Sequence, residues 1–154
     1  MAPRDPVKRL RDHCLAFPDA HEVAAWGELT FRVRNKIFAI HASPESHHSA
    51  GREGVWCKAK PVTQDLLLHA EPKRYFKPPY VGPRGWVGVW LDGGSVDWET
   101  LEGLLLDAYR LTAPKRLVAQ VDLLDQSEKS KVTSTARKTT TKKVARKVVR
   151  RGRG

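Results

Sequence analysis

The clearest pattern of hydrophobic and polar positions lies between residues 85 and 113, where it predicts a strand, a turn and a helix. Apolar residues and glycine fill every position of residues 86–91, so we expect this strand to be covered on both faces in the middle of a sheet. Apolar residues then recur at helical spacing over residues 98–111, with Asp97 placed as the N-cap and Pro114 as the stop. This segment is the expected centre of the fold.

The sequence before and after this segment predicts short strands and short helices. Two alternating runs, over residues 29–33 and 37–41, predict a β-hairpin. Their connection at Arg34-Asn35 suits a tight turn, because asparagine tolerates left-handed backbone geometry. Similar patterns predict helices over residues 6–17, 61–70 and 115–124, a strand over residues 54–58 and a short extended piece over residues 24–27.

Two segments lack a regular pattern and are expected to be loops. Residues 42–53 are polar, and residues 71–84 contain four prolines, which remove backbone donors and fix φ. Consecutive strands joined by short turns predict an α+β fold, in which a mainly antiparallel sheet packs against helices. The order of elements contains no strand–helix–strand repeat, which argues against a Rossmann-type fold.

Charge is distributed unevenly along the 154 residues. The chain has 28 Lys and Arg and 17 Asp and Glu, a net charge of +11. Residues 127–154 contain 11 bases and one acid, so their net charge is 11 − 1 = +10, and the other 17 bases and 16 acids leave +1. We therefore expect a nearly neutral folded domain over residues 1–126 and a basic tail over residues 127–154.

The tail has few large apolar residues, so we expect it to be disordered on its own. Its composition resembles the basic tails of bacterial nucleoid proteins and linker histones, which favours sequence-independent binding to phosphates. The alternative is a solubilising tail without a partner; a membrane surface is disfavoured because only Val and Ala face away from the charges. The candidate phosphate-binding residues of the tail are Arg137, Lys138, Lys142, Lys143, Arg146, Lys147, Arg150 and Arg151.

The order and spacing of several short pieces resemble the MmcQ/YjbR family over roughly residues 6–120. The pieces are Phe17-Pro18-Asp19-Ala20, Ala25-Trp26-Gly27-Glu28, Thr30-Phe31-Arg32-Val33, Lys36-Ile37-Phe38-Ala39, Lys58 with Pro61, Tyr80 with Gly85-Trp86-Val87, and Val96-Asp97-Trp98 with Tyr109-Arg110-Leu111. The resemblance implies a CyaY-like α+β fold that binds DNA through a double-wing arrangement. The chain departs from the family pattern at the Arg34-Asn35 turn and at Ala108.

Two groups of cations in the folded domain are candidate DNA-binding residues. Arg32, Arg34 and Lys36 belong to the predicted hairpin, which would act as a wing. A second basic surface, with Tyr75, Phe76 and Tyr80 interleaved for base stacking, would consist of Lys58, Lys60, Lys73, Arg74, Lys77 and Arg84. The alternative is that the strand face is merely solvated and that the loop aromatics pack on the core.

Other chemistry finds little support in the sequence. His47 and His48, with His41 and Glu45 nearby, match no established metal-ligand spacing. Cys14 and Cys57 have no metal or redox spacing and are expected to be buried, reduced thiols. No nucleophile with its base, carboxylate pair or phosphate-binding glycine loop is recognisable, so we expect neither an enzyme nor a metal or cofactor.

The sequence therefore predicts a non-catalytic, nucleoid-associated cytoplasmic protein that binds double-stranded DNA largely without sequence preference. The N-terminus lacks the apolar run of a secretory signal and no stretch is long enough to span a membrane, and a monomer is favoured. The alternative is a protein- or small-ligand-binding module with a pocket beside Trp26, Trp86 and Trp90, which the tail only localises to nucleic acid.

Overall fold

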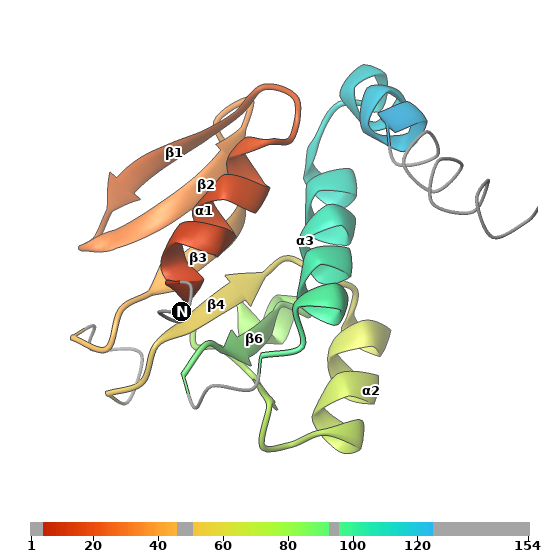
Figure 1. The fold of residues 1–154 in the computed structure, drawn as a ribbon. Helices are drawn as coiled ribbons and strands as arrows, with labels where there is room; N and C mark the ends of the chain where they lie inside the picture. Colours follow the sequence, from red (N-terminus) through yellow and green to blue (C-terminus); the bar gives the residue numbers. More distant parts are fainter. Residues whose placement is uncertain (1–4, 46–50, 93–95, 125–154) are drawn as a thin grey trace, which may run out of the picture. The chain divides into compact units, whose positions relative to one another are not determined.

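The computed structural model describes residues 5–45, 51–92 and 96–124, and it confirms the predicted α+β fold. Six strands form one antiparallel sheet in the order β1-β2-β3-β4-β6-β5 (Figure 1). The strands are β1 (Ala20–Ala25), β2 (Glu28–Val33), β3 (Lys36–Ala42), β4 (Gly54–Cys57), β5 (Tyr75–Phe76) and β6 (Val87–Trp90). The helices are α1 (Pro6–Leu15), α2 (Pro61–Ala70) and α3 (Trp98–Thr112), with a 3₁₀ helix η1 (Gly82–Arg84) and a helical stretch over residues 115–124.

The chain divides into two compact units, Met1–Val118 and Ala119–Gly154. In the second unit the described residues, 119–124, are helical, and the predicted tail over residues 127–154 lies outside the described part of the chain. Within residues 5–45, 51–92 and 96–124, every helix is too short or too polar to span a bilayer. All of the contacts described below lie within the first unit.

α1 and α3 lie on one face of the sheet and form the larger core with it (Figure 1). Tyr109 of α3 is fully buried in this core, where its ring stacks on Phe17 at a centroid distance of 4.8 Å and meets Phe38 edge-on at 5.7 Å. The Tyr109 hydroxyl donates to the carbonyl oxygen of Pro18 at 2.7 Å. This hydrogen bond connects α3 to the segment that leads into β1.

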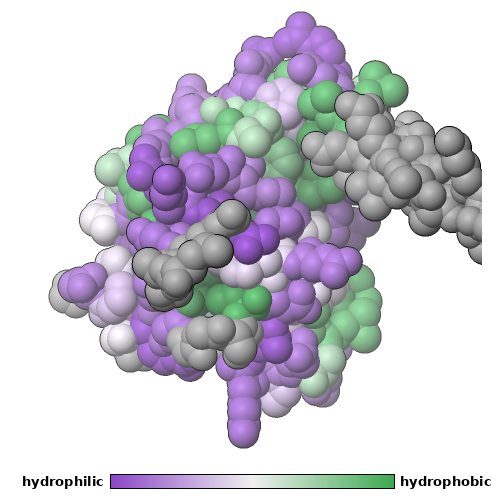
Figure 2. Space-filling view, in the orientation of Figure 1, coloured by the Kyte–Doolittle hydropathy of each residue, from purple (hydrophilic) through white to green (hydrophobic). Residues whose placement is uncertain are grey.

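The predicted ends of α3 and α2 are confirmed. The Asp97 carboxylate accepts from the backbone N–H of Thr100 at 3.2 Å and caps α3, and the helix ends before Pro114. α2 has the predicted bounds, but it buries none of its residues completely, and Val62 and Leu66 remain exposed. Figure 2 shows this hydrophobic area over α2 on an otherwise mostly hydrophilic face.

A β-bulge in β3 decides which side chains face the helices. Phe31 pairs with Ala39 and Arg32 pairs with Ile37, so Phe38 is the extra residue on β3. Phe38 packs on Tyr109 in the helix-side core, whereas Ile37 and Arg32 line a groove on the opposite face. Without the bulge, strict alternation would place Ile37 with Ala39 instead.

The face of the sheet opposite α1 and α3 has a smaller core of its own, formed by Ile40, Ala42, Trp56 and Trp86. β6 lies between β4 and β5, as the predicted position inside the sheet required. The Phe76 ring covers Gly88, which faces this side. The expectation that both faces of this strand are covered is therefore confirmed.

Two predictions about irregular segments were wrong. Residues 71–84 are not wholly irregular, because β5 pairs with β6 and η1 follows it; the four prolines lie outside Tyr75 and Phe76, so the backbone groups of those two residues are free to pair. The extended piece predicted over residues 24–27 is instead the end of β1 and the turn at Trp26-Gly27. β1 is an edge strand without clear alternation of buried and exposed residues, so the hydrophobic pattern did not predict its first residues.

Candidate functional site

The face of the sheet opposite α1 and α3 is hollowed into a groove of about 870 Å³. Ile40, Trp56 and Trp86 of the smaller core form part of its lining. The groove follows β2 and β3 and is bordered by the segment from Tyr80 to Trp86. Its lining includes four cations, a set of aromatic rings and an aliphatic floor with Ile37, Ile40 and Val81. We refer to this feature as the sheet groove.

Four cations from four separate segments line the sheet groove. Arg32 comes from β2, Lys36 from the start of β3, Lys58 from the residue after β4, and Arg84 from η1. Within the described part of the chain, none of these four side chains takes part in a salt bridge. Their charges are therefore available to an anionic partner.

Six arginines outside the groove are paired with neighbouring carboxylates. Six such pairs have N–O distances between 2.6 and 3.5 Å. The pairs are Arg9–Glu102, Arg11–Glu22, Arg34–Asp19, Arg52–Asp92, Arg74–Glu71 and Arg110–Asp107. In the sheet groove, by contrast, four cations from separate segments gather without a carboxylate partner among the described residues.

Glu28 is the single acid among the residues that line the sheet groove. It is 7% exposed, and its Oε2 atom accepts from the backbone N–H of Ser43 at 2.9 Å. Four bases and one acid leave the lining with a formal charge of 4 − 1 = +3. The carboxylate is occupied by the backbone and does not pair with a groove cation within the described residues.

Two aromatic side chains of the lining project into solvent, Trp26 with 78% and Tyr80 with 74% of the residue surface exposed. Both have left-handed backbones, with φ of 54° and 64°. Bulky residues rarely adopt this geometry, which costs on the order of 1–3 kcal/mol. The Trp26-Gly27 turn between β1 and β2 would suit asparagine better than tryptophan. Because both backbones are left-handed, the rings of Trp26 and Tyr80 are held exposed at a conformational cost.

Hydrogen bonds from α2 hold the segment that carries Tyr80 and Arg84. The Gln64 side chain donates to the carbonyl oxygens of Gly82, at 2.8 Å, and Trp86, at 2.5 Å. Gly85 has φ of 101° and lies so close to Pro61 that a Cβ atom there would be 2.8 Å from the Pro61 nitrogen. The border of the groove is therefore fixed in place before any partner arrives.

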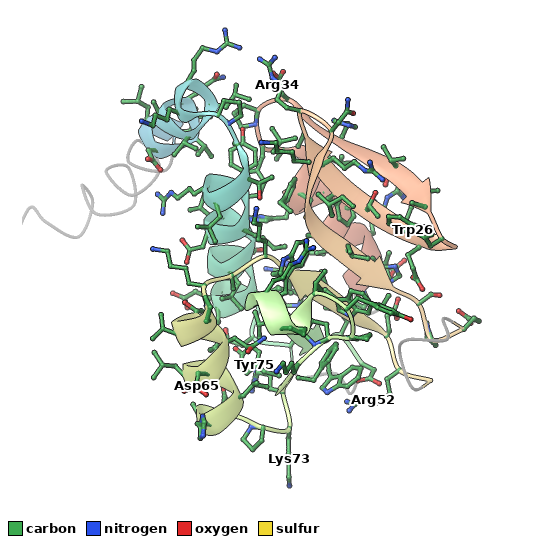
Figure 3. All side chains as sticks on the ribbon, turned by 180° about the vertical axis from the view of Figure 1, so that it is seen from behind. Trp26, Arg34, Arg52, Asp65, Lys73 and Tyr75 are labelled. Atoms are coloured by element: carbon green, nitrogen blue, oxygen red, sulfur yellow. The ribbon has the colours of Figure 1, made fainter. Side chains whose placement is uncertain are left out.

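The structure separates the predicted site residues of the domain into several places. Arg32, Lys36, Lys58 and Arg84 meet in the sheet groove. Arg34 lies at the β2–β3 turn, at the opposite end of the hairpin from Trp26 (Figure 3), and is paired with Asp19 at 3.5 Å. The other four predicted cations lie outside the groove lining. Lys60 precedes α2, and Lys77 packs on Gly82. Lys73 and Arg74 line a separate hollow of about 480 Å³. The predicted residues of the tail lie outside the described residues.

The aromatic residues suggested for stacking have different surroundings. Tyr75 is 2% exposed and belongs to the core, as the alternative interpretation had it. Phe76 stacks on Trp90 at a centroid distance of 3.9 Å, and the Arg52 guanidinium lies 4.0 Å from the Trp90 ring on the separate hollow. Tyr80 alone of the three predicted residues lines the groove.

The groove also contains residues that the sequence predictions missed, among them Trp56 and Glu28. Trp56 pairs with Ile40 across β3 and β4, so the two side chains point to the same face of the sheet, the one that carries the groove. Side-chain alternation within residues 54–58 could have indicated this position. Of the tryptophans suggested for a ligand pocket, Trp26 and Trp86 line the groove and Trp90 does not. The two hypotheses from sequence thus converge on one surface.

Within the part of the chain that the structure describes, no histidine or cysteine lines the sheet groove. Among the described residues no group of three or more His, Cys, Asp or Glu is arranged to hold a metal, and the predicted candidates His47 and His48 lie outside them. The His41 Nε2 atom lies 3.0 Å from Glu53 Oε1. Cys14 and Cys57 are buried free thiols, as expected; burial raises the pKa of Cys57 to about 12 and that of Cys14 well above its ordinary value.

Comparison with known proteins identifies a related domain. A model of the YjbR family matches residues 15–111, or 97 of 154 residues, which include the whole groove lining. A crystal structure of a Deinococcus radiodurans protein with a DUF419 domain is similar, with 24% identity, a TM-score of 0.59 and coverage of 71% of this chain and 81% of that one. A Pseudomonas syringae crystal structure is similar with 18% identity, a TM-score of 0.52 and coverage of 68% and 97%. None of the curated proteins matches the chain.

Proposed function

Since the chain belongs to the YjbR family, we propose that it is a non-catalytic DNA-binding protein of the cytoplasmic nucleoid. In this proposal the sheet groove holds the phosphodiester backbone, and the basic residues 127–154 add affinity that does not depend on sequence. The β1–β2 and β2–β3 hairpins, which border the groove at Trp26 and at Asn35-Lys36, would be the two wings.

The observation that carries the proposal is the set of uncompensated cations in the groove. Arg32, Lys36, Lys58 and Arg84 converge from four segments without a carboxylate partner among the described residues, whereas six arginines elsewhere are paired. Clustered positive charge of this kind favours a polyanion, because each phosphate contact releases a condensed counterion. The prearranged border held by Gln64 lowers the ordering cost of binding.

The tail supplies charge on a different scale. Residues 127–154 carry a net charge of +10, compared with +3 for the groove lining. For duplex DNA, log K falls by about 0.9 per contacted phosphate for each tenfold rise in salt concentration. We therefore expect the tail to dominate affinity at low salt and the groove to decide how the domain sits on DNA.

A salt titration of duplex binding, followed by fluorescence anisotropy, tests the proposal on the full chain and on residues 1–126. We expect the shorter chain to bind more weakly and with a flatter salt dependence, but still to bind at low salt. Complete loss of duplex binding by residues 1–126 would show that the groove is not a site for duplex DNA. Undiminished affinity would remove the tail from the mechanism.

The second candidate is a binding site for a small anionic aromatic ligand, with the tail serving only to localise the protein. The volume of about 870 Å³ and the rings of Trp26, Trp56 and Trp86 favour it, because small-molecule sites have this size and lining. A titration of tryptophan fluorescence with mononucleotides separates the two functions. Saturation by a mononucleotide, with no gain in affinity for an oligonucleotide, would favour the small ligand.

A further inference from the structure

We propose that the sheet groove binds unpaired bases, so that its preferred partner is single-stranded nucleic acid or an unwound segment rather than an intact duplex. Trp26 and Tyr80 would each stack on a base, while the groove cations hold the phosphates between them. The inference rests on the proposed function and adds the form of nucleic acid that the groove selects.

Both rings are exposed in a way that suits unpaired bases. Trp26 and Tyr80 present most of their surface to solvent at the edges of a cationic groove. In a duplex the base faces are already stacked on one another, so these rings would find none to cover. In a single strand every base has a free face, and stacking on an aromatic side chain is tolerant of sequence.

The backbone geometry of the same two residues also favours a role in binding. Trp26 and Tyr80 both have positive φ, although asparagine or glycine would occupy such positions with less strain. Strained residues of this kind gather at binding sites, where the fold holds them in place. Here the two strained, exposed aromatics border one groove, which indicates that their rings contact the ligand.

The floor of the groove is apolar and suits the face of a base. Ile37, Ile40 and Val81 line it together with the buried rings of Trp56 and Trp86. The backbone of a duplex is a polar, convex surface and would leave this apolar floor uncovered. A base that turns inward covers it with an apolar face while its phosphate remains beside Arg32, Lys58 or Arg84 at the rim.

The length of β2 limits how many nucleotides the groove takes. Its lining runs from Trp26 before β2 to Lys36 after it, and six strand residues span about 20 Å. At about 3.4 Å per nucleotide, this length corresponds to roughly five or six nucleotides, and fewer if the strand is extended. The groove is therefore matched to a short unpaired segment.

The test compares a 12-nucleotide oligo(dT) with a mixed-sequence duplex of 12 base pairs, both binding to the full chain. Anisotropy is measured at roughly 0.3 M salt, where screening reduces the contribution of the tail. The variants are Trp26→Asn and Tyr80→Asn, because asparagine tolerates left-handed backbones and the fold is retained. The exposed residue Leu66 of α2, mutated to Ala, is the control for loss of apolar surface away from the groove.

We expect each aromatic variant to bind oligo(dT) at least fivefold more weakly while its duplex affinity changes less than twofold, and Leu66→Ala to change neither. Unchanged oligo(dT) affinity in both variants would overturn base stacking, and duplex binding by the full chain would still uphold the proposed function. Equal losses of affinity for oligo(dT) and for the duplex would also overturn base stacking, since the rings would then contact a feature that both nucleic acids share. Failure of the full chain to bind either nucleic acid would overturn both proposals.

Discussion

The ring of Phe76 lies directly over Gly88, so that a Cβ atom built on the glycine would overlap the ring. Phe76 is held there by its stacking on Trp90, and a Cβ atom built on Gly54 would lie 3.3 Å from the same ring. The absence of a side chain at position 88 thus allows β5 to close the edge of the sheet with a large aromatic residue. This close approach makes the glycine sensitive to the smallest substitution.

We expect Gly88→Ala to lower the free energy of unfolding by about 1–3 kcal/mol, because the added methyl group must displace the Phe76 ring or the backbone. Urea denaturation followed by circular dichroism measures the change. Gly103→Ala in α3 is the matched control, since a Cβ atom there meets nothing within 4 Å. The control is expected to be more stable by about 0.5–1 kcal/mol, as alanine favours helix. Equal effects at both positions would contradict the proposed clash.

Trp26→Asn is expected to raise the free energy of unfolding, by about 1 kcal/mol, even as it weakens binding. The left-handed backbone at φ of 54° strains a tryptophan, and Asn-Gly is a favoured pair in tight hairpin turns. Urea denaturation again gives the measurement. A loss of stability would mean that the Trp26 ring supports the fold, which its 78% exposure argues against.

Removing groove cations should reduce the salt dependence of duplex binding. We expect the full chain with Arg32, Lys58 and Arg84 replaced by Gln to lose up to about 0.9 of slope in log K against log salt for each phosphate contact that is lost. Anisotropy titrations at several salt concentrations give this slope.

The control for charge removes three cations from the helix side of the domain, with Lys8, Arg9 and Arg110 replaced by Gln. It has the same net charge as the groove variant, but Arg9 and Arg110 are already paired with carboxylates. We expect its slope to remain close to that of the wild type. Equal slopes for the two triple variants would indicate that only net charge matters.

The pair Arg11–Glu22 should make stability depend on pH. Hydrogen bonds from Arg11 at 2.9 and 2.6 Å lower the pKa of Glu22 from its ordinary 4.5. A lowered carboxyl pKa contributes stability that is fully present above about 4.5 and is lost as the pH falls through the folded-state value. Glu22→Gln should therefore melt at a lower temperature than the wild type at pH 7, and the difference should disappear in acid.

Melting temperatures measured by circular dichroism between pH 7 and pH 3 test this expectation. The exposed Glu45, which forms no salt bridge within the described residues, is the control as Glu45→Gln. Its melting temperature should follow the wild type across the range. A difference between Glu22→Gln and wild type that stays constant with pH would rule out a contribution from ionisation.

The two thiols should be unreactive in the folded protein. Cys14 and Cys57 are buried, and burial raises the pKa of Cys57 to about 12, so the reactive thiolate is scarce at neutral pH. We expect a chromogenic disulfide reagent to label neither residue at pH 8 until denaturant is added, and then to label both. Rapid labelling without denaturant would show that the core between α1 and β4 opens.

Much of the fold could be predicted because its elements have strong local patterns. The run of apolar residues in 86–91, the N-cap at Asp97 and the hairpin around Arg34-Asn35 each depend on neighbours within a few residues. Arg34 and Asn35 do have positive φ of 52° and 63°. Local patterns failed for β1, an edge strand, and for β5, a two-residue strand that depends on its partner β6.

The groove could be predicted only in pieces. Arg32, Lys58 and Arg84 are far apart in the chain, and nothing in their local sequence shows that they share a face. The bulge at Phe38, which turns Ile37 toward the groove, has no local signal either. Neither does the positive φ of Tyr80, which arises within a segment pinned by Gln64 from another element.

The proline pair after β5 limits how other molecules can add strands to this edge of the sheet at high protein concentration. β5 is an outer edge of the sheet, and such edges readily recruit strands from other molecules. It is only two residues long, and Pro78 and Pro79 follow almost at once, neither of which has a backbone N–H to offer. A neighbouring molecule therefore has almost no ladder to extend on this side, which leaves β1 as the edge where edge-to-edge aggregation would begin.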